Sequence, residues 1–261
     1  MKSMKQEILA LFDKYGTDVR RALRENKKLP YLYALAELRE NLLEWYDFKP
    51  EGRVLQAGAD FGALTGLLAR RTSSVTVLDA SEESLEVVKA RYPQEKKLIF
   101  RTGRLTEYAR ETAQSAEPAA GYDYVTLIGT FDERETLEAQ LQAAKSLLAP
   151  GGTLITAVCN RFGIKYFAGT ERDAVTASKR ELEALLPGGR FYYPMPDYRL
   201  AGELYSDGYL PKKGDLTGAL AVYDMPKYLL MDVGAAYDAV CEDGRFDQFA
   251  NSFLVFWEKE G

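Results

Sequence analysis

The sequence predicts an α/β protein built on a largely parallel, doubly wound sheet. From residue 54 onward, short apolar runs rich in β-branched residues alternate with helical patterns, the order that produces parallel strands joined by crossover helices. With 261 residues, of which 46% are hydrophobic, the chain can bury one full-sized core and a small appendage. One main globular domain is therefore expected.

The elements can be followed in order along the chain. Residues 1–47 carry apolar side chains at helical spacing and predict an N-terminal helical segment. It comprises an opening helix and a second helix over YLYALAELRENLLEWY, which FKPEG ends, and residues 48–261 form the predicted main domain. In its alternating part we expect strands at 54–57, 74–78, 97–101, 124–128 and 153–158 and helices at 63–71, 82–92 and 133–148. Beyond it we expect a helix at 179–186, an ordered aromatic and proline-rich loop at 187–218, a helix around 227–242 and a strand at 252–257.

Composition excludes several classes of function. The formal charge of −5 and the pI near 5.2 give no general attraction to nucleic acid or anionic lipid. No apolar run suits a signal peptide or a membrane span, so a soluble cytoplasmic protein without membrane insertion is expected. Cys159 and Cys241 lack the spacing of a disulfide framework or a zinc site, and there is no histidine. No metal site is predicted, and proton transfer falls to Asp, Glu, Lys, Tyr or Cys.

The stretch VLQAGADFGALTGLLAR at 54–70 predicts a strand, a glycine turn and a helix. Gly58 and Gly62 permit a tight turn and the close approach of a ligand, and the helix directs its N-terminal amides to the same place. The G-x-x-x-G spacing differs from the G-x-G-x-x-G of nicotinamide-binding turns, because position 60 is Asp and position 63 is not glycine. A purely structural turn is the alternative.

The next predicted strand ends in SVTVLDAS, which places Asp79 at its carboxyl end. Asp79 follows Gly58 by about 20 residues, the interval at which an acidic side chain meets a ribose. The alternative is that Asp79 only caps the following helix, for which Ser81 is an equally good candidate.

Four segments in this order, VLQAGADFGALTGLLA, VTVLDAS, YDYVTLIG and LLAPGGTLITAV, resemble class I S-adenosylmethionine-dependent methyltransferases, and the resemblance covers most of residues 35–261. RENLLEWYDF, NRFGIKYFAG, FYYPMPDYRL, YSDGYLPKKG and FANSFLVF are similar to bacterial methyltransferases that accompany glycosyltransferases of surface-polysaccharide assembly. The resemblance implies a Rossmann-like, seven-stranded, mostly parallel sheet with an antiparallel last strand. It also implies S-adenosylmethionine as cofactor, a small-molecule or saccharide acceptor, and a homodimer or a glycosyltransferase as partner.

The resemblance implies that Gly58 and Gly62 face the methionine part of the cofactor and that Asp79 faces the ribose. It also implies that Gly129 and Thr130, at the end of the fourth strand, border the sulfonium. Three positions depart from the family: Gln56 and Arg104 stand where it usually has acidic residues, and Asp60 where it has glycine. A carboxylate at 60 turned towards the ligand carboxylate would cost about 4 kcal/mol at roughly 4 Å. A working turn therefore requires Asp60 to point to solvent or to the cofactor's ammonium group. The predicted cofactor-binding residues are Gln56, Gly58, Ala59, Asp60, Gly62, Asp79, Ala80, Arg104, Leu105, Gly129 and Thr130.

Two regions are candidates for the acceptor side. In FDER, which follows the fourth strand, Asp132 or Glu133 is the candidate base towards a hydroxyl acceptor, with a helix N-cap as the alternative. NRFGIKYFAG and the tyrosines near 193 offer an amide, cations and rings, with plain aromatic packing as the alternative. The family's longer insertion is reduced here to residues 171–177, so the acceptor pocket is open or is closed by a second subunit. The predicted substrate-binding residues are Asn160, Arg161, Lys165, Tyr166, Tyr193, Asp197 and Tyr198.

These observations favour a methyltransferase that aligns donor and acceptor for in-line displacement. The alternative, motivated by Gln56, Asp60 and Arg104, is a degenerate methyltransferase fold that serves as a non-catalytic binding or scaffold module in polysaccharide synthesis. A nicotinamide oxidoreductase is disfavoured by the missing glycine and by the lack of a histidine or a Tyr-x-x-x-Lys acid pair.

Overall fold

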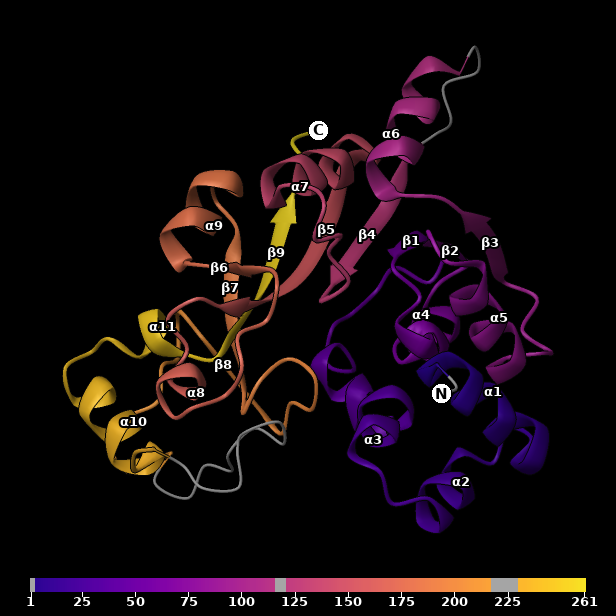
Figure 1. Cartoon of the computed structure of the whole chain (residues 1–261). Coiled ribbons are helices and arrows are strands. Elements are labelled where there is room, and N and C mark those ends of the chain that lie inside the picture. Colours follow the sequence, from indigo (N-terminus) through magenta and orange to yellow (C-terminus); the bar gives the residue numbers. More distant parts are fainter. Residues whose placement is uncertain (1–2, 116–120, 217–229) are drawn as a thin grey trace. The chain divides into compact units, whose positions relative to one another are not determined.

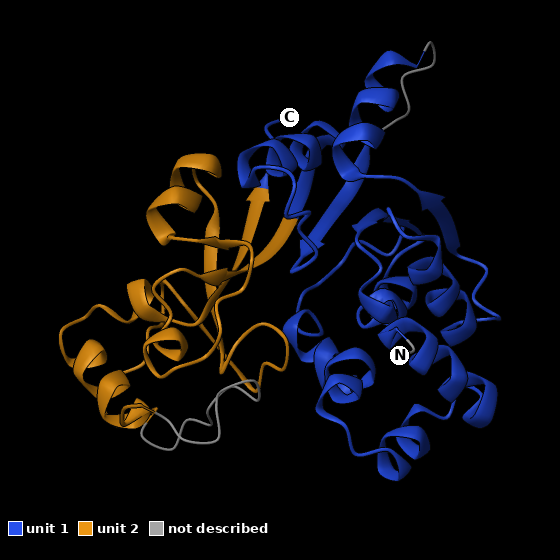
Figure 2. Ribbon diagram, in the orientation of Figure 1, with its two compact units in different colours: residues 1–154, 258–261 blue, residues 155–257 orange. Residues whose placement is uncertain are grey.

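A computed structural model describes residues 3–115, 121–216 and 230–261. The chain divides into two compact units, residues 1–154 with 258–261 and residues 155–257, which are blue and orange in Figure 2. We call them unit 1 and unit 2. The predicted N-terminal segment 1–47 belongs to unit 1 together with the first strands.

Unit 1 contains the parallel strands that the alternation predicts. The strand order is β3-β2-β1-β4-β5, and the register sets Ala57 of β1 opposite Leu78 of β2 and Leu127 of β4. The carboxyl ends of these strands therefore share one edge, and the strand order reverses between β1 and β4, the place where open α/β sheets bind ligands. The strands are β1 (Arg53–Ala57), β2 (Ser74–Asp79), β3 (Leu98–Thr102), β4 (Tyr122–Ile128) and β5 (Leu148–Asn160), of which β5 passes into unit 2 after residue 154.

After β1, the helices of unit 1, labelled in Figure 1, differ from the prediction at α6 and α7. A helix that was not predicted, α6 (Leu105–Gln114), follows β3, and α7 (Leu137–Ser146) begins later than expected because Thr136 caps it through the backbone N–H of Ala139. The other elements after β1 are η2 (Asp60–Gly62), α4 (Thr65–Arg71) and α5 (Glu82–Arg91).

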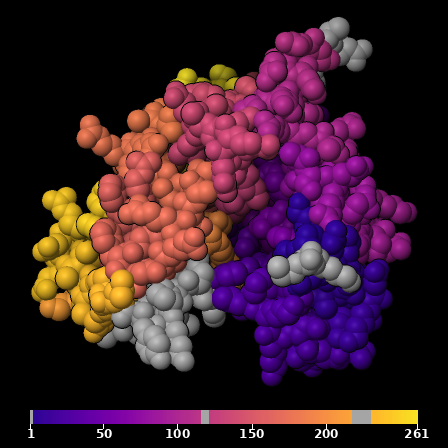
Figure 3. All heavy atoms as spheres, viewed as in Figure 1, coloured from indigo at the N-terminus to yellow at the C-terminus, as the bar shows by residue number. Residues whose placement is uncertain are grey.

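The N-terminal segment packs onto the rest of unit 1. It comprises α1 (Met4–Tyr15), α2 (Val19–Glu25), α3 (Leu29–Leu35) and η1 (Glu37–Leu42). The single helix expected over YLYALAELRENLLEWY is interrupted at Ala36, whose ψ of 135° is extended. Ile8, Phe12 and Leu35 form a buried cluster with Val87 of α5, and in the space-filling view the indigo N-terminal atoms lie along the purple and magenta atoms of the same unit (Figure 3).

Unit 2 contains antiparallel pairs. The predicted last strand is β9 (Ser252–Glu258), and β7 (Arg190–Met195) pairs antiparallel with it and with β8 (Glu203–Ser206). The stretch 187–218, expected as a loop, thus supplies two strands, because alternate side chains of FYYPM are buried on one face. The other elements of unit 2 are α8 (Ile164–Phe167), β6 (Thr176–Ala177), α9 (Lys179–Leu185), α10 (Val233–Glu242) and α11 (Phe246–Phe249).

The predicted fold class is confirmed. The last strand runs antiparallel to β5, as bonds from Asn160 N–H to Asn251 O and from Lys259 N–H to Gly152 O establish at 2.9 Å each. The two short strands β6 and β8 extend the seven strands that were expected. Residues 227–229, the start of the helix expected around 227–242, lie outside the described residues.

Candidate functional site

A cavity of about 390 Å³ opens in unit 1 at the carboxyl ends of the parallel strands. The strand register explains its position, because the loops after β1, β2, β3 and β4 all begin at this edge. Six predicted cofactor-binding residues and both predicted catalytic residues line it. They are Gly58, Asp79, Ala80, Arg104, Leu105 and Thr130, together with Asp132 and Glu133.

Gly58 lies where the loop after β1 comes close to the loop after β4. Its φ is +91°, and a Cβ added to it would lie 2.2 Å from Cβ of Thr130. Thr130 in turn donates its hydroxyl to Ala57 O at 2.6 Å. Only glycine fits this position, so the glycine that the motif predicted is required by both backbone angle and space.

Asp79 ties the glycine turn to the end of β2. Its Oδ2 accepts the backbone N–H of Ala59 at 2.9 Å, and its Oδ1 accepts that of Ser81 at 2.8 Å. Ser81, not Asp79, is the N-cap of α5, since its side chain accepts from Ser84 N–H. Each carboxylate oxygen of Asp79 has capacity for a second hydrogen bond, and the side chain lines the cavity, so it suits the hydroxyls of a ribose.

Gln56 serves the turn internally. Its Nε2 donates to Gly58 O at 3.2 Å, and its Oε1 accepts the Thr65 hydroxyl at 2.7 Å. A carboxylate could not donate to Gly58 O, so the amide at this position is matched to the local geometry. Gln56 is buried and does not line the cavity. The direct cofactor contact predicted for it does not fit this position.

Asp60 has a partner that the sequence did not suggest. Its carboxylate forms an ion pair and a short hydrogen bond with Arg39 of η1, whose side chain is only 4% exposed. The structure thus adds an arrangement that was not expected beside solvent and the cofactor ammonium: the carboxylate is paired within unit 1. The paired cation offsets the repulsion that an isolated carboxylate would exert on an anionic ligand group.

Asp132 is bound on two sides by cations at the cavity. Arg134 donates Nε and Nη2 to it at 2.8 and 2.9 Å, and Nε of Arg104 lies 3.4 Å from its Oδ2. The Arg134 hydrogen bonds lower the pKa of Asp132 to about 2. Asp132 does not cap α7, which excludes the helix-cap alternative for it, and its low pKa makes it a weak proton acceptor near neutral pH. Arg104, which stands where the family usually has an acidic residue, is thus paired with the carboxylate of Asp132.

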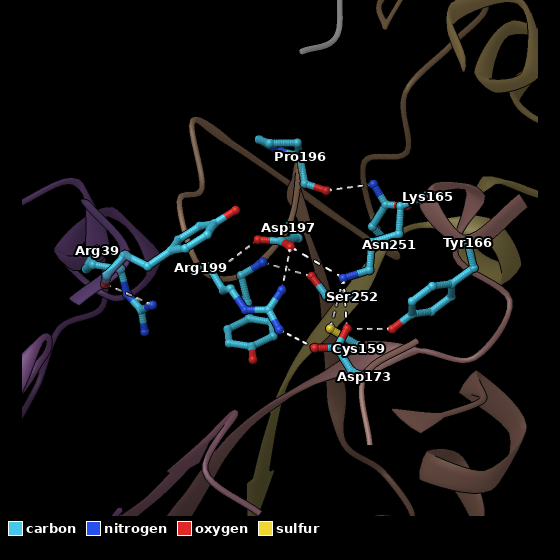
Figure 4. Close-up of polar contacts among 12 residues, drawn as sticks. Arg39, Cys159, Lys165, Tyr166, Asp173, Pro196, Asp197, Arg199, Asn251 and Ser252 are labelled. Atoms are coloured by element: carbon cyan, nitrogen blue, oxygen red, sulfur yellow. Dashed lines mark hydrogen bonds and ion pairs between the residues drawn. The ribbon is translucent and has the colours of Figure 1, made fainter. Parts of the chain in front are cut away.

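Unit 2 buries a network of charges among the residues predicted to bind substrate. Figure 4 shows Lys165 and Arg199 pointing towards Asp173 and Asp197, with the Tyr166 hydroxyl donating to Asp173 at 2.7 Å. Nζ of Lys165 lies 3.1 Å from Asp173, 3.6 Å from Asp197 and 3.3 Å from the Cys159 sulfur. The two cations balance the two carboxylates.

The charges of this network hold one another ionised. Burial lowers the pKa of Lys165, but the Cys159 sulfur and the carboxylates of Asp197 and Asp173 raise it by more. Burial raises the pKa of Asp173, but Arg199 and Lys165 outweigh it and hold that pKa well below its usual range. The side chain of Lys165 is fully buried, and direct contact with an acceptor does not fit this burial.

The other predicted substrate-binding residues also make contacts within unit 2. Asn160 donates Nδ2 to Gln248 O and Ala250 O, and Arg161 pairs with Glu181 at 2.9 Å. The Tyr193 hydroxyl donates to Asp207, and the backbone N–H of Tyr198 donates to the Ser252 hydroxyl. A purely structural role is therefore well supported for Asn160 and Tyr193, while acceptor binding by this group of residues remains a prediction.

Sequence reasoning missed Arg39, Asp173 and Arg199. Arg39 had a signal, because it stands at a core-facing position of the apolar pattern Leu35, Arg39, Leu42, and a charge there requires a buried partner. Asp173 and Arg199 lie in irregular segments whose contacts depend on tertiary structure, so no local pattern identifies them. Among the described residues, no group of acidic or thiol side chains is arranged to hold a metal, and no helix has the length and apolar character needed to cross a bilayer.

Comparisons with known proteins agree with this geometry. Residues 55–154 match the model of a protein family described as a methyltransferase domain. A ubiquinone biosynthesis O-methyltransferase of Escherichia coli O7:K1 is 30% identical over 113 residues, which cover 42% of this chain and 44% of that protein. The chain therefore spans less than half the length of the curated relatives that it matches.

Two solved structures share the fold along nearly the whole chain. A S-adenosylmethionine-dependent methyltransferase of Thermotoga maritima aligns with a TM-score of 0.52 at 15% identity, covering 97% of this chain and 100% of that one. Phosphoethanolamine N-methyltransferase 1 of Haemonchus contortus aligns with a TM-score of 0.54 at 13% identity, covering 98% of this chain and 49% of that one. Residues 55–154 thus match a methyltransferase domain family in sequence, and the chain shares the fold of these two methyltransferase structures.

Proposed function

We propose that the protein transfers a methyl group from S-adenosylmethionine to a small-molecule acceptor. The observation that carries the proposal is Asp79, whose carboxylate lines the unit 1 cavity while it fixes the glycine turn beside it. A nucleoside fits this arrangement, because the ribose hydroxyls can donate to Asp79 and the backbone at Gly58 allows close approach.

The residues around the cavity suit the cofactor in distinct ways. S-adenosylmethionine supplies an electrophilic methyl group on a positively charged sulfur. Gly58 and Thr130, which touch across the cavity edge, would border that group, and Asp79 would hold the ribose. The protein's contribution is alignment of the reacting atoms, an effect that can supply about 7–11 kcal/mol of the barrier reduction.

Removal of a proton from the acceptor falls to Glu133 in this proposal. Asp132 and Glu133 both line the cavity, but the pKa of Asp132 is lowered to about 2 by Arg134. A group so acidic takes up a proton poorly at neutral pH. Asp132 would instead hold Arg104 and Arg134 at the cavity edge.

The acceptor is proposed to be a hydroxyl compound, with a saccharide of surface-polysaccharide assembly as the specific candidate. The hydroxyl is supported by the O-methyltransferase relative, and the saccharide by the resemblance carried by NRFGIKYFAG and FYYPMPDYRL. A cytoplasmic location and a homodimer or a glycosyltransferase partner belong to the same proposal.

Titration calorimetry with S-adenosylmethionine and S-adenosylhomocysteine tests the proposal without knowledge of the acceptor. We expect saturable binding to the wild type and at least tenfold weaker binding to Asp79→Ala. A flat titration at millimolar ligand, with a cooperative melt that proves the protein folded, would refute the enzyme and favour the non-catalytic scaffold. Release of S-adenosylhomocysteine with a panel of monosaccharide and phenol acceptors then separates the saccharide from other hydroxyl compounds.

A further inference from the structure

The glycine turn contains two residues in a backbone conformation that side chains disfavour. Asp60 has a φ of 39° and Phe61 a φ of 54°, and these are the positive-φ residues other than glycine among the described residues. In this region Cβ crowds the backbone, so a residue other than glycine relaxes out of it unless its surroundings hold it there. Something in unit 1 must therefore keep the turn in place.

Three contacts from the N-terminal segment and α5 hold these two residues. The Asp60 carboxylate pairs with the buried guanidinium of Arg39. Nη1 of Arg91 donates to Phe61 O at 2.9 Å and also to Ala34 O at 2.9 Å, so it joins the turn to the end of α3. The Phe61 ring packs against the buried cluster that α1 and α3 form with Val87.

The same turn begins at Gly58 and Ala59, which Asp79 and Thr130 fix from the side of the cavity. Its start is thus held by residues at the carboxyl ends of the strands, and its strained middle is held by the N-terminal segment and α5. A shift of Asp60 and Phe61 to an unstrained conformation would change the path of the backbone immediately after the residues that line the cavity.

We propose that Arg39 is a positioning residue for the cofactor site: by holding Asp60 in its left-handed conformation, it keeps the turn in the shape that binds. This inference rests on the proposed function, since the ligand of the turn is S-adenosylmethionine. Loss of Arg39 lowers the fraction of molecules with a competent turn, and the measured affinity falls in proportion to that fraction. The N-terminal segment in this way acts on the cofactor site through the turn.

Glycine and alanine at position 60 separate backbone strain from charge. We compare S-adenosylhomocysteine binding by calorimetry for the wild type, Arg39→Met, and Arg39→Met combined with Asp60→Gly or with Asp60→Ala. Both double variants lack the carboxylate, but only glycine adopts the left-handed conformation without strain. We expect at least tenfold weaker binding for Arg39→Met and for the alanine double variant, and binding within about threefold of wild type for the glycine double variant.

Arg20→Met is the matched control. Arg20 forms an exposed ion pair with Glu37, and Glu37 lies in η1, the element that contains Arg39. It should leave affinity unchanged. Equal binding by the two double variants would overturn the inference, since charge alone would then explain the effect. Wild-type affinity in Arg39→Met would overturn it as well.

Hydrogen exchange on the ligand-free proteins keeps this test separate from the proposed function and from global folding. Backbone amides at 59–63 should exchange at least tenfold faster in Arg39→Met than in the wild type, while amides of β1 and β4 stay protected. Equal exchange at 59–63 contradicts the inference even if the wild type binds the cofactor. If the wild type binds no cofactor, the proposed function fails, and the exchange rates still decide whether Arg39 holds the turn.

Discussion

Oδ2 of Asp79 accepts the backbone N–H of Ala59 at 2.9 Å. This bond joins the residue expected to hold the ribose to the turn expected to hold the methionine part of the cofactor. Asp79 therefore braces the turn, and in the proposed function it also binds the ribose, so a change there should affect binding and stability together.

We expect Asp79→Ala to weaken cofactor binding at least tenfold and to lower the free energy of unfolding by about 1.5–3 kcal/mol, the size of a lost hydrogen bond to a charged group. Ser81→Ala is the control. It removes the cap of α5, at a cost of about 1 kcal/mol, without touching Ala59 or the turn. Calorimetry and urea unfolding measure both effects; equal binding by the two variants would remove Asp79 from the site.

Gly58→Ala should lower the free energy of unfolding more than a glycine substitution whose only cost is an unfavourable backbone conformation. A Cβ at 58 would collide with Thr130 at 2.2 Å, whereas Gly151, also at positive φ (+70°), has nothing within 4 Å of such an atom. Gly151→Ala should cost about 1–2 kcal/mol of unfolding free energy. Gly58→Ala should cost clearly more and abolish cofactor binding, and comparable unfolding curves for the two variants would contradict the close approach at Thr130.

The sheet could be predicted well because short stretches of sequence identify its strands. Apolar runs of β1, β2 and β4, separated by helical patterns, fixed both strand identity and parallel order. The exceptions have tertiary causes. α6 follows Arg104 without a side-chain cap, so no N-terminal signal marks it, and the aromatic stretch of β7 resembles a loop until β9 pairs with it.

In the site, too, the residues of a local motif were predicted and the contacts made by tertiary packing were not. Gly58 and Asp79 were predictable because a motif with fixed spacing encodes the turn and the end of the next strand. The partner of Asp60 was not, because Arg39 comes from an N-terminal helix whose docking no local pattern specifies. Gln56 and Asp60, which depart from the family in sequence, are each matched by a neighbour in the structure: Thr65 and Gly58 for Gln56, and Arg39 for Asp60.

Asp132 should contribute to the pH dependence of stability only in acid. Arg134 lowers its pKa in the folded state to about 2, below its ordinary value of about 3.9. A depressed pKa stabilises the fold above the unfolded value, and that stabilisation is lost as pH falls through the folded value. The melting temperature of Asp132→Asn should thus lie below that of wild type at pH 5 and above, and the difference should vanish as pH falls from about 4 to about 2. A difference that is constant over this range would contradict the pairing with Arg134.

The buried charges of unit 2 should prove more important for stability than the exposed ones beside them. Lys165 is fully buried between Asp173 and Asp197, so its replacement by methionine leaves the buried carboxylate of Asp197 and the 22% exposed carboxylate of Asp173 with Arg199 as their remaining cation. Breaking a buried pair in this way typically costs about 3–5 kcal/mol. We expect Lys165→Met to lower the free energy of unfolding by that amount.

Arg161→Met is the matched control, because it removes a nearby cation that forms a more exposed ion pair. The side chain of Arg161 is 44% exposed and that of its partner Glu181 is 35% exposed. Exposed pairs contribute about 0–1 kcal/mol, so this variant should unfold almost like the wild type. Urea unfolding followed by tryptophan fluorescence suits the comparison, since Trp257 lies in β9 of unit 2 and Trp45 in unit 1. If Lys165→Met were as stable as Arg161→Met but lost acceptor binding, Lys165 would be a substrate ligand rather than a structural cation. Its burial would then not keep it from the acceptor.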